Sequence, residues 1–301
     1  MTSDGRSTGP ILLVGADGQL GTALAPRLAR LGALVRATRA DADLERPDDI
    51  RNLVRRVRPR LVVNAAGYTA VDDAEGDEAR CARLNTIAPT VLAEESARMG
   101  VPFIHYSTNY VFDGDQGAPY SETETMSPLG VYGATKAEGE RGVIGANPRH
   151  VILRTAALYG HAGRNFMLRV LELAREREEL RVVDDQFISP TPAWLVADAT
   201  VTVISQLFTE RADTCGVFHL TTTGAVSWHE FARRILALDP QAGSQRAKTV
   251  VAIGTKDYPT PARRPPNGVL SVERFERTFG HRLPPWDDAL RRTLQDPGAC
   301  A

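Results

Sequence analysis

"ILLVGADGQLG", residues 11–21, decides the fold, because a short apolar run here ends in Gly15, Gly18 and Gly21. The run shows no alternation of polar and apolar side chains, which is typical of a parallel strand buried on both faces. Glycines after such a strand permit a tight turn and let backbone N–H groups approach a pyrophosphate at the N-terminus of the next helix. The spacing differs from the commoner G-x-G-x-x-G, and a glycine-rich turn alone is weak evidence. Its place after the first strand nevertheless predicts a dinucleotide-binding turn, with contacts from Gly15, Asp17, Gly18, Gln19 and Leu20.

The same rhythm of buried strand and amphipathic helix continues through the first half of the chain. Further strands are expected at residues 33–38, 60–67, 101–108 and 150–156, and helices at 19–31, 47–57, 78–100 and 131–145. Repeated β-α-β units imply right-handed crossovers between parallel strands. We therefore predict an α/β fold with a doubly wound, Rossmann-like parallel sheet over residues 1–160.

Beyond residue 160 the pattern loosens into separate helices and short strands. Helices are expected at 166–179, 192–208 and 227–238, and strands at 180–185 and 216–220. We predict that residues 161–301 mainly form a smaller α/β substrate-binding domain facing the carboxyl ends of the sheet. The boundary is soft, because the chain can cross between the two domains.

Charge and cysteine usage narrow the function classes. A net charge of −1 and an isoelectric point of about 6.6 give no basic field that would favour nucleic acid or an anionic membrane. Cys81, Cys215 and Cys300 lack metal-like spacing and fit a reducing compartment. Residues 1–10 contain no apolar signal or membrane segment and are interpreted as a short tail. We expect a cytoplasmic protein without a nucleic-acid or membrane partner.

A second decisive stretch is "VYGATKAEGE", residues 131–140, which places Tyr132 and Lys136 about one helical turn apart. Four residues correspond to roughly 6 Å of helical rise, so both side chains lie on one face. Tyrosine has an ordinary pKa of about 10, and a close ammonium would lower it toward the range of an efficient proton donor. The pair alone would also fit a helix start with a solvated lysine. Thr108, at the carboxyl end of the fourth strand, completes the short-chain dehydrogenase constellation and favours catalysis.

The end of the second strand bears on the choice of cofactor. An acid there would contact a ribose 2′-hydroxyl, whereas a cation would accept a 2′-phosphate. The chain has Thr38 and Arg39, which favours NADPH and leaves NADH open. Asp43 and Leu44 are expected to flank the adenine. The remaining cofactor contacts would come from small residues after the third strand and from the catalytic pair, namely Ala65, Ala66, Gly67, Tyr132 and Lys136.

Several stretches are distinctive in order and spacing: "GADGQLG", "NAAGYTAVDDAE", "HYSTNYVFDG", "SPLGVYGATKAEGE", "NFMLRVL", "VVDDQFISPT", "GVFHLTTTGAVSWHEFA" and "YPTPARRPPN". Over about residues 11–294 they resemble the dTDP-4-dehydrorhamnose reductases, an extended short-chain dehydrogenase family. The resemblance implies that Thr108, Tyr132 and Lys136 are the catalytic trio. Tyr132 would protonate the C4 oxygen of dTDP-4-dehydro-L-rhamnose while NADPH delivers hydride to C4, giving dTDP-L-rhamnose.

The same resemblance implies the other site residues. Arg264 could meet a diphosphate through its planar guanidinium, whereas Arg263 is expected on the solvated surface. Asn85 would be structural or part of a proton relay, and a helix Asn with neither role is the alternative. A homodimer is a further possibility. The implied substrate contacts are Thr108, Asn109, Tyr110, Phe187 and Arg264.

The chain departs from the family pattern at residues expected near the substrate. Asn109 replaces the usual Asp, Ala157 a frequent Trp, Gly130 the usual Asn, and Phe187 and Ile188 a commonly small residue. A pocket of different shape is therefore expected. Trp194 occupies one place where some members have an acidic Mg²⁺ ligand, so we predict no metal.

Other functions stay open as alternatives. A 4-ketoreductase for another dTDP-4-keto-6-deoxyhexose would need the same trio. Epimerases regenerate their nicotinamide, and dehydratases resemble one another in an Asp-Glu pair after the Thr, where this chain has Asn109 and Tyr110. A non-catalytic NADP-binding regulatory subunit, as in the relative that accompanies methionine adenosyltransferase, would show no turnover. No hydrolase motif is present, and His105, within an apolar run, is interpreted as a core histidine.

Overall fold

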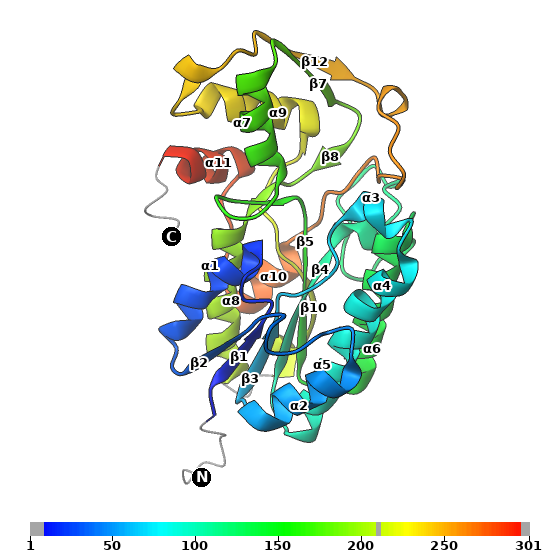
Figure 1. The fold of residues 1–301 in the computed structure, drawn as a ribbon, viewed down its shortest axis with the longest axis vertical. Coiled ribbons are helices and arrows are strands. Elements are labelled where there is room, and N and C mark those ends of the chain that lie inside the picture. The colour runs from blue at the N-terminus through cyan, green and yellow to red at the C-terminus, as the bar shows by residue number, and fades with distance from the viewer. Residues whose placement is uncertain (1–8, 209–211, 296–301) are drawn as a thin grey trace.

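The computed structural model describes residues 9–208 and 212–295. Its centre is a parallel sheet of six strands in the order β10-β5-β4-β3-β1-β2 (Figure 1). The strands are β1 (Ile11–Val14), β2 (Leu34–Ala37), β3 (Leu61–Asn64), β4 (Phe103–Thr108), β5 (His150–Thr155) and β10 (Gly216–His219). The expected N-terminal tail falls mostly on residues 1–8, outside the described residues, and so does Cys300.

Strand β1 lies where the strand order reverses. It pairs in parallel with β2 on one side and with β3 on the other. Ile11 and Leu13 enter the core on one face of the sheet, and Leu12 and Val14 enter the core on the other. Burial on both faces explains why the strand has no polar position. The predicted doubly wound sheet is confirmed, and ligands of such sheets bind at this switch point, beyond the carboxyl ends of the strands.

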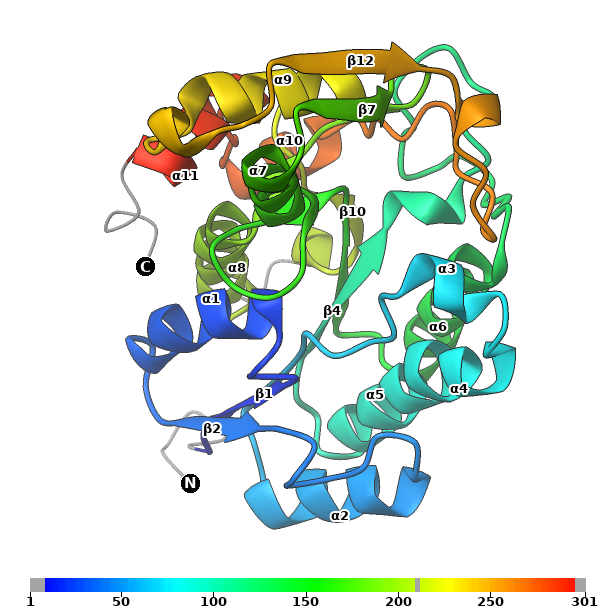
Figure 2. The same ribbon diagram turned by 45° about the horizontal axis from the view of Figure 1, so that its top comes forward.

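Helices cover both faces of the sheet (Figures 1 and 2). On one face lie α1 (Gln19–Ala29) and α8 (Ala193–Leu207), which pack against each other. On the other lie α2 (Pro47–Val57), α5 (Ala88–Arg98) and α6 (Val131–Ala146). Among the described residues, no helix combines the length and the apolar character needed to cross a membrane.

The helix expected at 78–100 is divided by a π-helical turn. It consists of α4 (Glu78–Ala82), the turn η1 (Arg83–Ile87) and α5. Pro89 has no N–H with which to bond the carbonyl of Asn85, so the regular hydrogen-bond ladder is interrupted there. That carbonyl faces α6 at close range, since a Cβ on Gly139 would lie 2.0 Å from it. The glycine therefore lets α6 approach the turn that carries Asn85.

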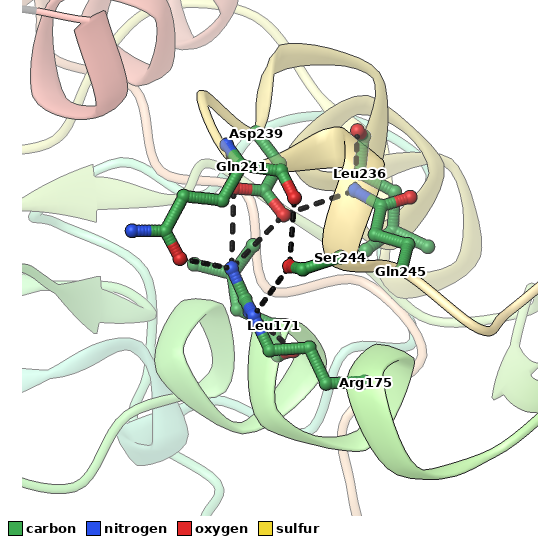
Figure 3. Close-up of polar contacts among 7 residues, drawn as sticks. All are labelled: Leu171, Arg175, Leu236, Asp239, Gln241, Ser244 and Gln245. Carbon is green, nitrogen blue, oxygen red and sulfur yellow. Dashed lines mark hydrogen bonds and ion pairs between the residues drawn. The ribbon is translucent and has the colours of Figure 1, made fainter.

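A smaller α/β layer lies over the carboxyl ends of the strands (Figure 2). Its apolar core is built around Tyr159, Met167 and Phe231. Figure 3 shows Arg175, near the end of the helix Phe166–Glu176, bonded to residues that follow the helix Trp228–Leu238. Its Nη2 lies 3.2 Å from Asp239 Oδ2, and its Nε donates to Ser244 Oγ at 3.1 Å. The elements are α7 (Phe166–Glu176), α9 (Trp228–Leu238), α11 (Trp286–Gln295), the parallel pair β7 (Glu179–Val183) and β12 (Thr249–Ile253), and the antiparallel pair β8 (Phe187–Ile188) and β11 (Val226–Ser227).

The chain crosses between the two layers several times. After residue 160, α8 packs against α1, β10 pairs with β5, and α10 (Glu273–Phe279) packs on β10. The strand expected at 216–220 is thus an edge of the large sheet and not part of the smaller layer. The division near residue 160 stays a prediction about folding units. Short elements near the site are α3 (Val71–Ala74), the 3₁₀ turn η2 (Asn109–Val111), β6 (Leu158–Tyr159) and β9 (Thr191–Pro192).

Candidate active site

A cavity of about 1010 Å³ runs along the carboxyl ends of β1, β3, β4 and β5 and reaches the smaller layer. Thr108, Asn109 and Tyr110 contribute to its wall, whereas Phe187 and Arg264 do not. The wall also includes every residue expected to contact the cofactor: Gly15, Asp17, Gly18, Gln19, Leu20, Thr38, Arg39, Asp43, Leu44, Ala65, Ala66, Gly67, Tyr132 and Lys136. Residues far apart in sequence thus meet in one cavity. The sequence predicts this, because they lie at the carboxyl ends of parallel strands or on one face of the helix that carries Tyr132 and Lys136.

The glycine turn leaves room for a ligand to approach the backbone. Gly15 has a φ of +76°, and a Cβ there would lie 2.7 Å from the backbone nitrogen of Ala66. A Cβ on Gly21 would lie 2.0 Å from Gly15 O, so this helix can start close to the strand only with glycine. Gly18 caps α1 without a side chain, and Gln19 Nε2 is buried with no hydrogen-bond partner in the described part of the chain. The free donors at this helix N-terminus fit an anion such as a pyrophosphate.

The loop after β2 contains Arg39, for which the described part of the chain shows no ion-pair partner. Thr38 donates from its backbone nitrogen and its hydroxyl to Asp41 Oδ2, at 2.8 and 3.0 Å, and these bonds lower the pKa of Asp41. Thr38 therefore has its donors occupied in this conformation. Arg39 lies exposed on the cavity wall. Its place on the cavity wall would let it bind a 2′-phosphate.

Tyr132 and Thr108 meet across the cavity. Tyr132 lies in the first turn of α6, Thr108 ends β4, and both side chains line the cavity. Burial raises the pKa of Tyr132 to about 12, and the neighbouring Thr108 hydroxyl opposes this rise. The ring of Tyr110 stands edge-on to that of Tyr132, with centroids 5.6 Å apart. The phenol is thus protonated at neutral pH and held beside a hydroxyl.

Lys136 lies one turn further along α6 and turns toward β4. Its Nζ donates to the carbonyl oxygen of Tyr106 at 2.5 Å and lies 3.2 Å from His105 Nε2. Burial lowers the pKa of Lys136 to about 8. The expected lowering of the tyrosine pKa by a close ammonium is not seen in this conformation, because desolvation of the phenol dominates and Nζ bonds to β4. The histidine expected in the core is therefore a direct neighbour of the lysine.

Asn109 ties the catalytic loop to a distant segment. It is buried, accepts a bond from Thr108 Oγ1 at 3.3 Å and donates to Gly268 O at 3.1 Å. Gly268 is required by this approach, since a Cβ there would lie 2.2 Å from Asn109 Nδ2. An amide suits this place because it both accepts and donates, which the carboxylate of the usual Asp would not do.

Asn85 clasps the loop after β3. Its Oδ1 accepts from the backbone nitrogen of Tyr68 at 2.8 Å, and its Nδ2 donates to Tyr68 O at 3.1 Å. Tyr68 and Gly67 line the cavity. These contacts support the structural role that was expected for Asn85; a proton relay stays a prediction.

The N-terminus of α6 is capped from outside the helix. Glu75, just after α3, accepts from the backbone nitrogen of Val131 at 2.9 Å. Gly130 makes room for it, since a Cβ there would lie 2.4 Å from Glu75 Oε1. Sequence reasoning missed this cap because the two residues are far apart in the chain. It helps to fix the turn that carries Tyr132.

Phe187 and Arg264 lie beside the cavity wall. Phe187 is exposed, and its neighbour Ile188 faces the cavity. Arg264 donates to Asp72 Oδ2 at 2.7 Å and lies with its guanidinium 5.8 Å from the centre of the Tyr110 ring. Substrate contacts from Phe187 and Arg264 stay predictions.

The cavity has further wall residues that sequence reasoning did not single out. Ser107 Oγ is buried without a hydrogen-bond partner among residues 9–208 and 212–295, next to Thr108. Its place at a strand end was a signal for it. Arg164, Phe166 and Trp228 line the end formed by the smaller layer, where no local pattern announced them.

Ala157 lies on the cavity wall with a strained backbone. Its φ is +42°, a conformation that favours glycine. Strain retained beside a cavity points to a functional position. The small side chain leaves open a volume that a Trp would fill.

Metal ligands are not gathered in the part of the chain that the structure describes: it holds no group of three or more His, Cys, Asp or Glu placed to bind an ion. The absence of a metal requirement stays a prediction.

The fold and this site define a Rossmann-type protein of the short-chain dehydrogenase/reductase class. The model of the family described as the RmlD substrate binding domain matches residues 9–298, and the chain belongs to this family. It is 44% identical over 292 residues to a dTDP-4-dehydrorhamnose reductase of Burkholderia thailandensis, covering 95% of this chain and 98% of that protein. The resemblance seen in the sequence is thereby confirmed.

Two solved structures share the whole architecture. A dTDP-4-dehydrorhamnose reductase from Clostridium acetobutylicum superposes with a TM-score of 0.88 at 33% identity, over 95% of this chain and 98% of the other. The Bacillus anthracis enzyme of the same name, solved in complex with NADP, gives a TM-score of 0.86 at 29% identity, over 96% and 100%. The arrangement of the layers around the cavity is therefore that of these reductases.

Proposed function

We propose that this protein reduces the C4 keto group of dTDP-4-dehydro-L-rhamnose with NADPH, giving dTDP-L-rhamnose. One observation carries the proposal: Thr108, Tyr132 and Lys136 converge on the cavity that begins at the glycine turn. The 44% identical relative of the same name and the NADP complex of a similar structure support the substrate and the cofactor.

The residues along the cavity fit a dinucleotide. NADPH, when bound, would supply the hydride. The N-terminus of α1 and the unpartnered Gln19 amide would hold the pyrophosphate, and Arg39 the 2′-phosphate. Asp43 and Leu44 would flank the adenine. The short side chains of Ala65 and Ala66, with Gly67, leave space along the third strand end, and Lys136 would face the nicotinamide ribose.

The proton comes from Tyr132. As C4 accepts hydride, its oxygen gains charge and takes the proton of the phenol. The raised pKa of Tyr132 keeps that proton in place at neutral pH, and Thr108 orients the phenol and the keto oxygen by hydrogen bonding. Asn109 and Tyr110 would contact the sugar from the loop after β4, with Phe187 and Arg264 further out.

A second candidate is a 4-ketoreductase for another dTDP-4-keto-6-deoxyhexose. Ala157 favours this candidate, because this residue of the cavity wall is small where the family frequently has a Trp. A dehydratase is disfavoured by the neutral Asn109-Tyr110 pair, and a regulatory subunit by the complete trio. An epimerase would regenerate its nicotinamide and so would not consume NADPH stoichiometrically.

NADPH consumption at 340 nm against a panel of dTDP-4-keto-6-deoxyhexoses tests the proposal, with product configuration read by NMR. We expect stoichiometric oxidation with the 4-dehydrorhamnose substrate and a loss of roughly 10²–10⁴-fold in Tyr132→Phe. Tyr258→Phe, on the surface, is the matched control and should keep full activity. Unchanged turnover in Tyr132→Phe would contradict the proton-donor role.

We infer cytoplasmic action on a small nucleotide sugar, from the spacing of the cysteines and the near-neutral charge. A homodimer, and independence from nucleic acid, membrane and metal, are parts of the same proposal.

A further inference from the structure

Behind the cavity, Asn64, His105 and Lys136 form a row across β3, β4 and α6. Asn64 Nδ2 lies 3.1 Å from His105 Nδ1, and His105 Nε2 lies 3.2 Å from Lys136 Nζ. Asn64 and His105 are each 1% exposed and Lys136 is 5% exposed. Each polar atom of the row therefore has to find its partner inside the protein.

The backbone of Ala66 decides the orientation of the Asn64 amide. Ala66 N–H donates to Asn64 Oδ1 at 3.1 Å, which turns the NH₂ group toward the ring of His105. An amide NH₂ can only donate, so His105 Nδ1 accepts. In a neutral imidazole the proton then lies on Nε2.

An Nε2–H directed at Lys136 Nζ excludes an ammonium in this position, because an ammonium has donors and no acceptor. An uncharged amine has a lone pair that can accept from Nε2–H while one of its own hydrogens bonds to Tyr106 O. Burial acts in the same direction on both partners. It lowers the pKa of Lys136 to about 8 and holds the pKa of His105 well below its ordinary value.

The other groups that face Lys136 do not reverse this balance. Glu140, on α6, and Cys81, on α4, raise the pKa of Lys136 less than burial lowers it. Glu140 is already paired with Arg154, and burial raises the pKa of the Cys81 thiol. Tyr132, on the same helix, keeps its proton.

On the ring itself one effect opposes the assignment. The backbone carbonyl of Asn64 favours a protonated ring and so raises the pKa of His105. This effect is smaller than that of burial, which lowers that pKa. The side-chain NH₂ of Asn64, 3.1 Å from Nδ1, can only donate to the ring and so sets the tautomer.

We propose that His105 is a positioning residue that stabilises the uncharged amine form of Lys136, by donating from an Nε2–H whose place is set by Asn64 and Ala66. Lys136 takes up a proton when Nζ leaves this contact for the side of the cavity where Tyr132 lies. The inference deepens the role of Lys136 in the proposed function. Only the expected effect of Lys136 on turnover rests on that function. The protonation states can be measured without substrate.

The tautomer is tested on the unmodified protein. Labelling with ¹⁵N-histidine gives six side chains, and the signals lost in His105→Gln identify His105. We expect the neutral Nε2–H tautomer from pH 6 to 9. A neutral Nδ1–H tautomer, or an imidazolium, would overturn the inference.

The lysine is tested by titration of its ε-position with ¹³C- and ¹⁵N-labelled lysine. The sequence holds three lysines, and Lys248 and Lys256 are exposed references. In His105→Gln the side-chain oxygen can accept from an ammonium, so the Lys136 midpoint should rise by about one pH unit, a tenfold change in proton affinity. The matched control His161→Gln, on the surface, should leave the midpoint in place. An unchanged or lower midpoint in His105→Gln would refute the contact's role, whereas absent turnover with both NMR results intact would refute only the proposed function.

Discussion

Helix α6 carries two buried ionisable clusters one turn apart. One contains an ion pair, and the other contains a lysine without a counter-ion in the part of the chain that the structure describes. On the core side, Glu140 accepts from Arg154 Nε at 3.0 Å and from Nη2 at 2.7 Å. Arg154 Nη1 lies 3.3 Å from His219 Nε2, and His219 Nδ1 lies 3.1 Å from Ser271 O, so each of these side-chain nitrogens has a hydrogen-bond partner. On the cavity side, Lys136 has no carboxylate within ion-pair distance among the described residues.

The difference separates a cluster that holds the fold from one held ready for chemistry. A buried pair with complete hydrogen bonding is costly to break. A buried cation without a counter-ion shifts its pKa, which is the mark of a reactive group. Variants on the core side should therefore change stability, and variants on the cavity side should change turnover.

The largest effect is expected on the core side. Glu140→Ala leaves the guanidinium of Arg154 buried and unpaired, which should lower the free energy of unfolding by about 3–5 kcal/mol. Denaturant unfolding measures it. Glu138→Ala is the matched control on the same helix, because Glu138 pairs with Arg141 at the surface and its removal should cost less than about 1 kcal/mol. Equal losses in the two variants would erase the distinction between a buried and a surface pair.

Next comes the cavity side. Lys136→Met removes the cation proposed to hold the ribose and assist Tyr132, and kcat/KM should fall by roughly 10²–10³-fold, or about 3–4 kcal/mol. Its unfolding free energy should change less than that of Glu140→Ala, because no buried partner loses a counter-ion. Lys256→Met, on the surface, should match the unchanged protein. If Lys136→Met kept full activity, the cavity cluster would have no catalytic role.

A smaller effect appears in acid. Burial and the neighbouring Arg154 lower the pKa of His219 to about 3, so the folded state disfavours the charged ring. Its stabilising contribution is complete above the ordinary pKa of 6.5 and is lost as the pH falls below it. Between pH 6.5 and 5 we expect a loss of about 2 kcal/mol that His219→Gln does not show. Exposed His161→Gln should keep the slope, and identical slopes in all three proteins would exclude His219 as the cause.

The smallest effect appears in alkali. The folded-state pKa of Lys136 is about 8, below its ordinary 10.5, so the unfolded chain binds more protons between these values. Stability should rise with pH across this window, by about 1 kcal/mol from pH 8 to 9, relative to Lys136→Met. Thermal or denaturant unfolding of both proteins at each pH measures the difference. A falling difference would mean that the lysine is charged in the folded protein.

Much of this molecule could be predicted from the sequence because the signals are local. Apolar runs without alternation mark strands buried on both faces, and the carboxyl ends of such strands meet at one edge. Thr108 ends a strand, and Tyr132 and Lys136 share a helix face, so their convergence followed from the pattern. The glycine turn after β1 placed the proposed cofactor end in the same way.

The remainder depends on contacts between distant segments. No residue near Gly130 in the sequence indicates that Glu75 caps α6, which begins at the next residue. No residue near His105 in the sequence indicates that Asn64 sets the tautomer of that histidine. The sequence of the strand Gly216–His219 does not indicate that it pairs with β5 in the central sheet. Such features arise when segments pack, and a single sequence shows them only as isolated polar or glycine residues.

The return of α8 and β10 to the central layer also has a consequence for how such a protein can change. No single cut of the polypeptide yields either layer whole. The smaller α/β layer begins with α7, but residues 193–219 then return to the central sheet layer and complete it with α8 and β10. Exchange of one contiguous cassette between relatives would sever the sheet from its edge. A new sugar preference must therefore accumulate by point replacements around the cavity, at places such as Ala157 and Asn109.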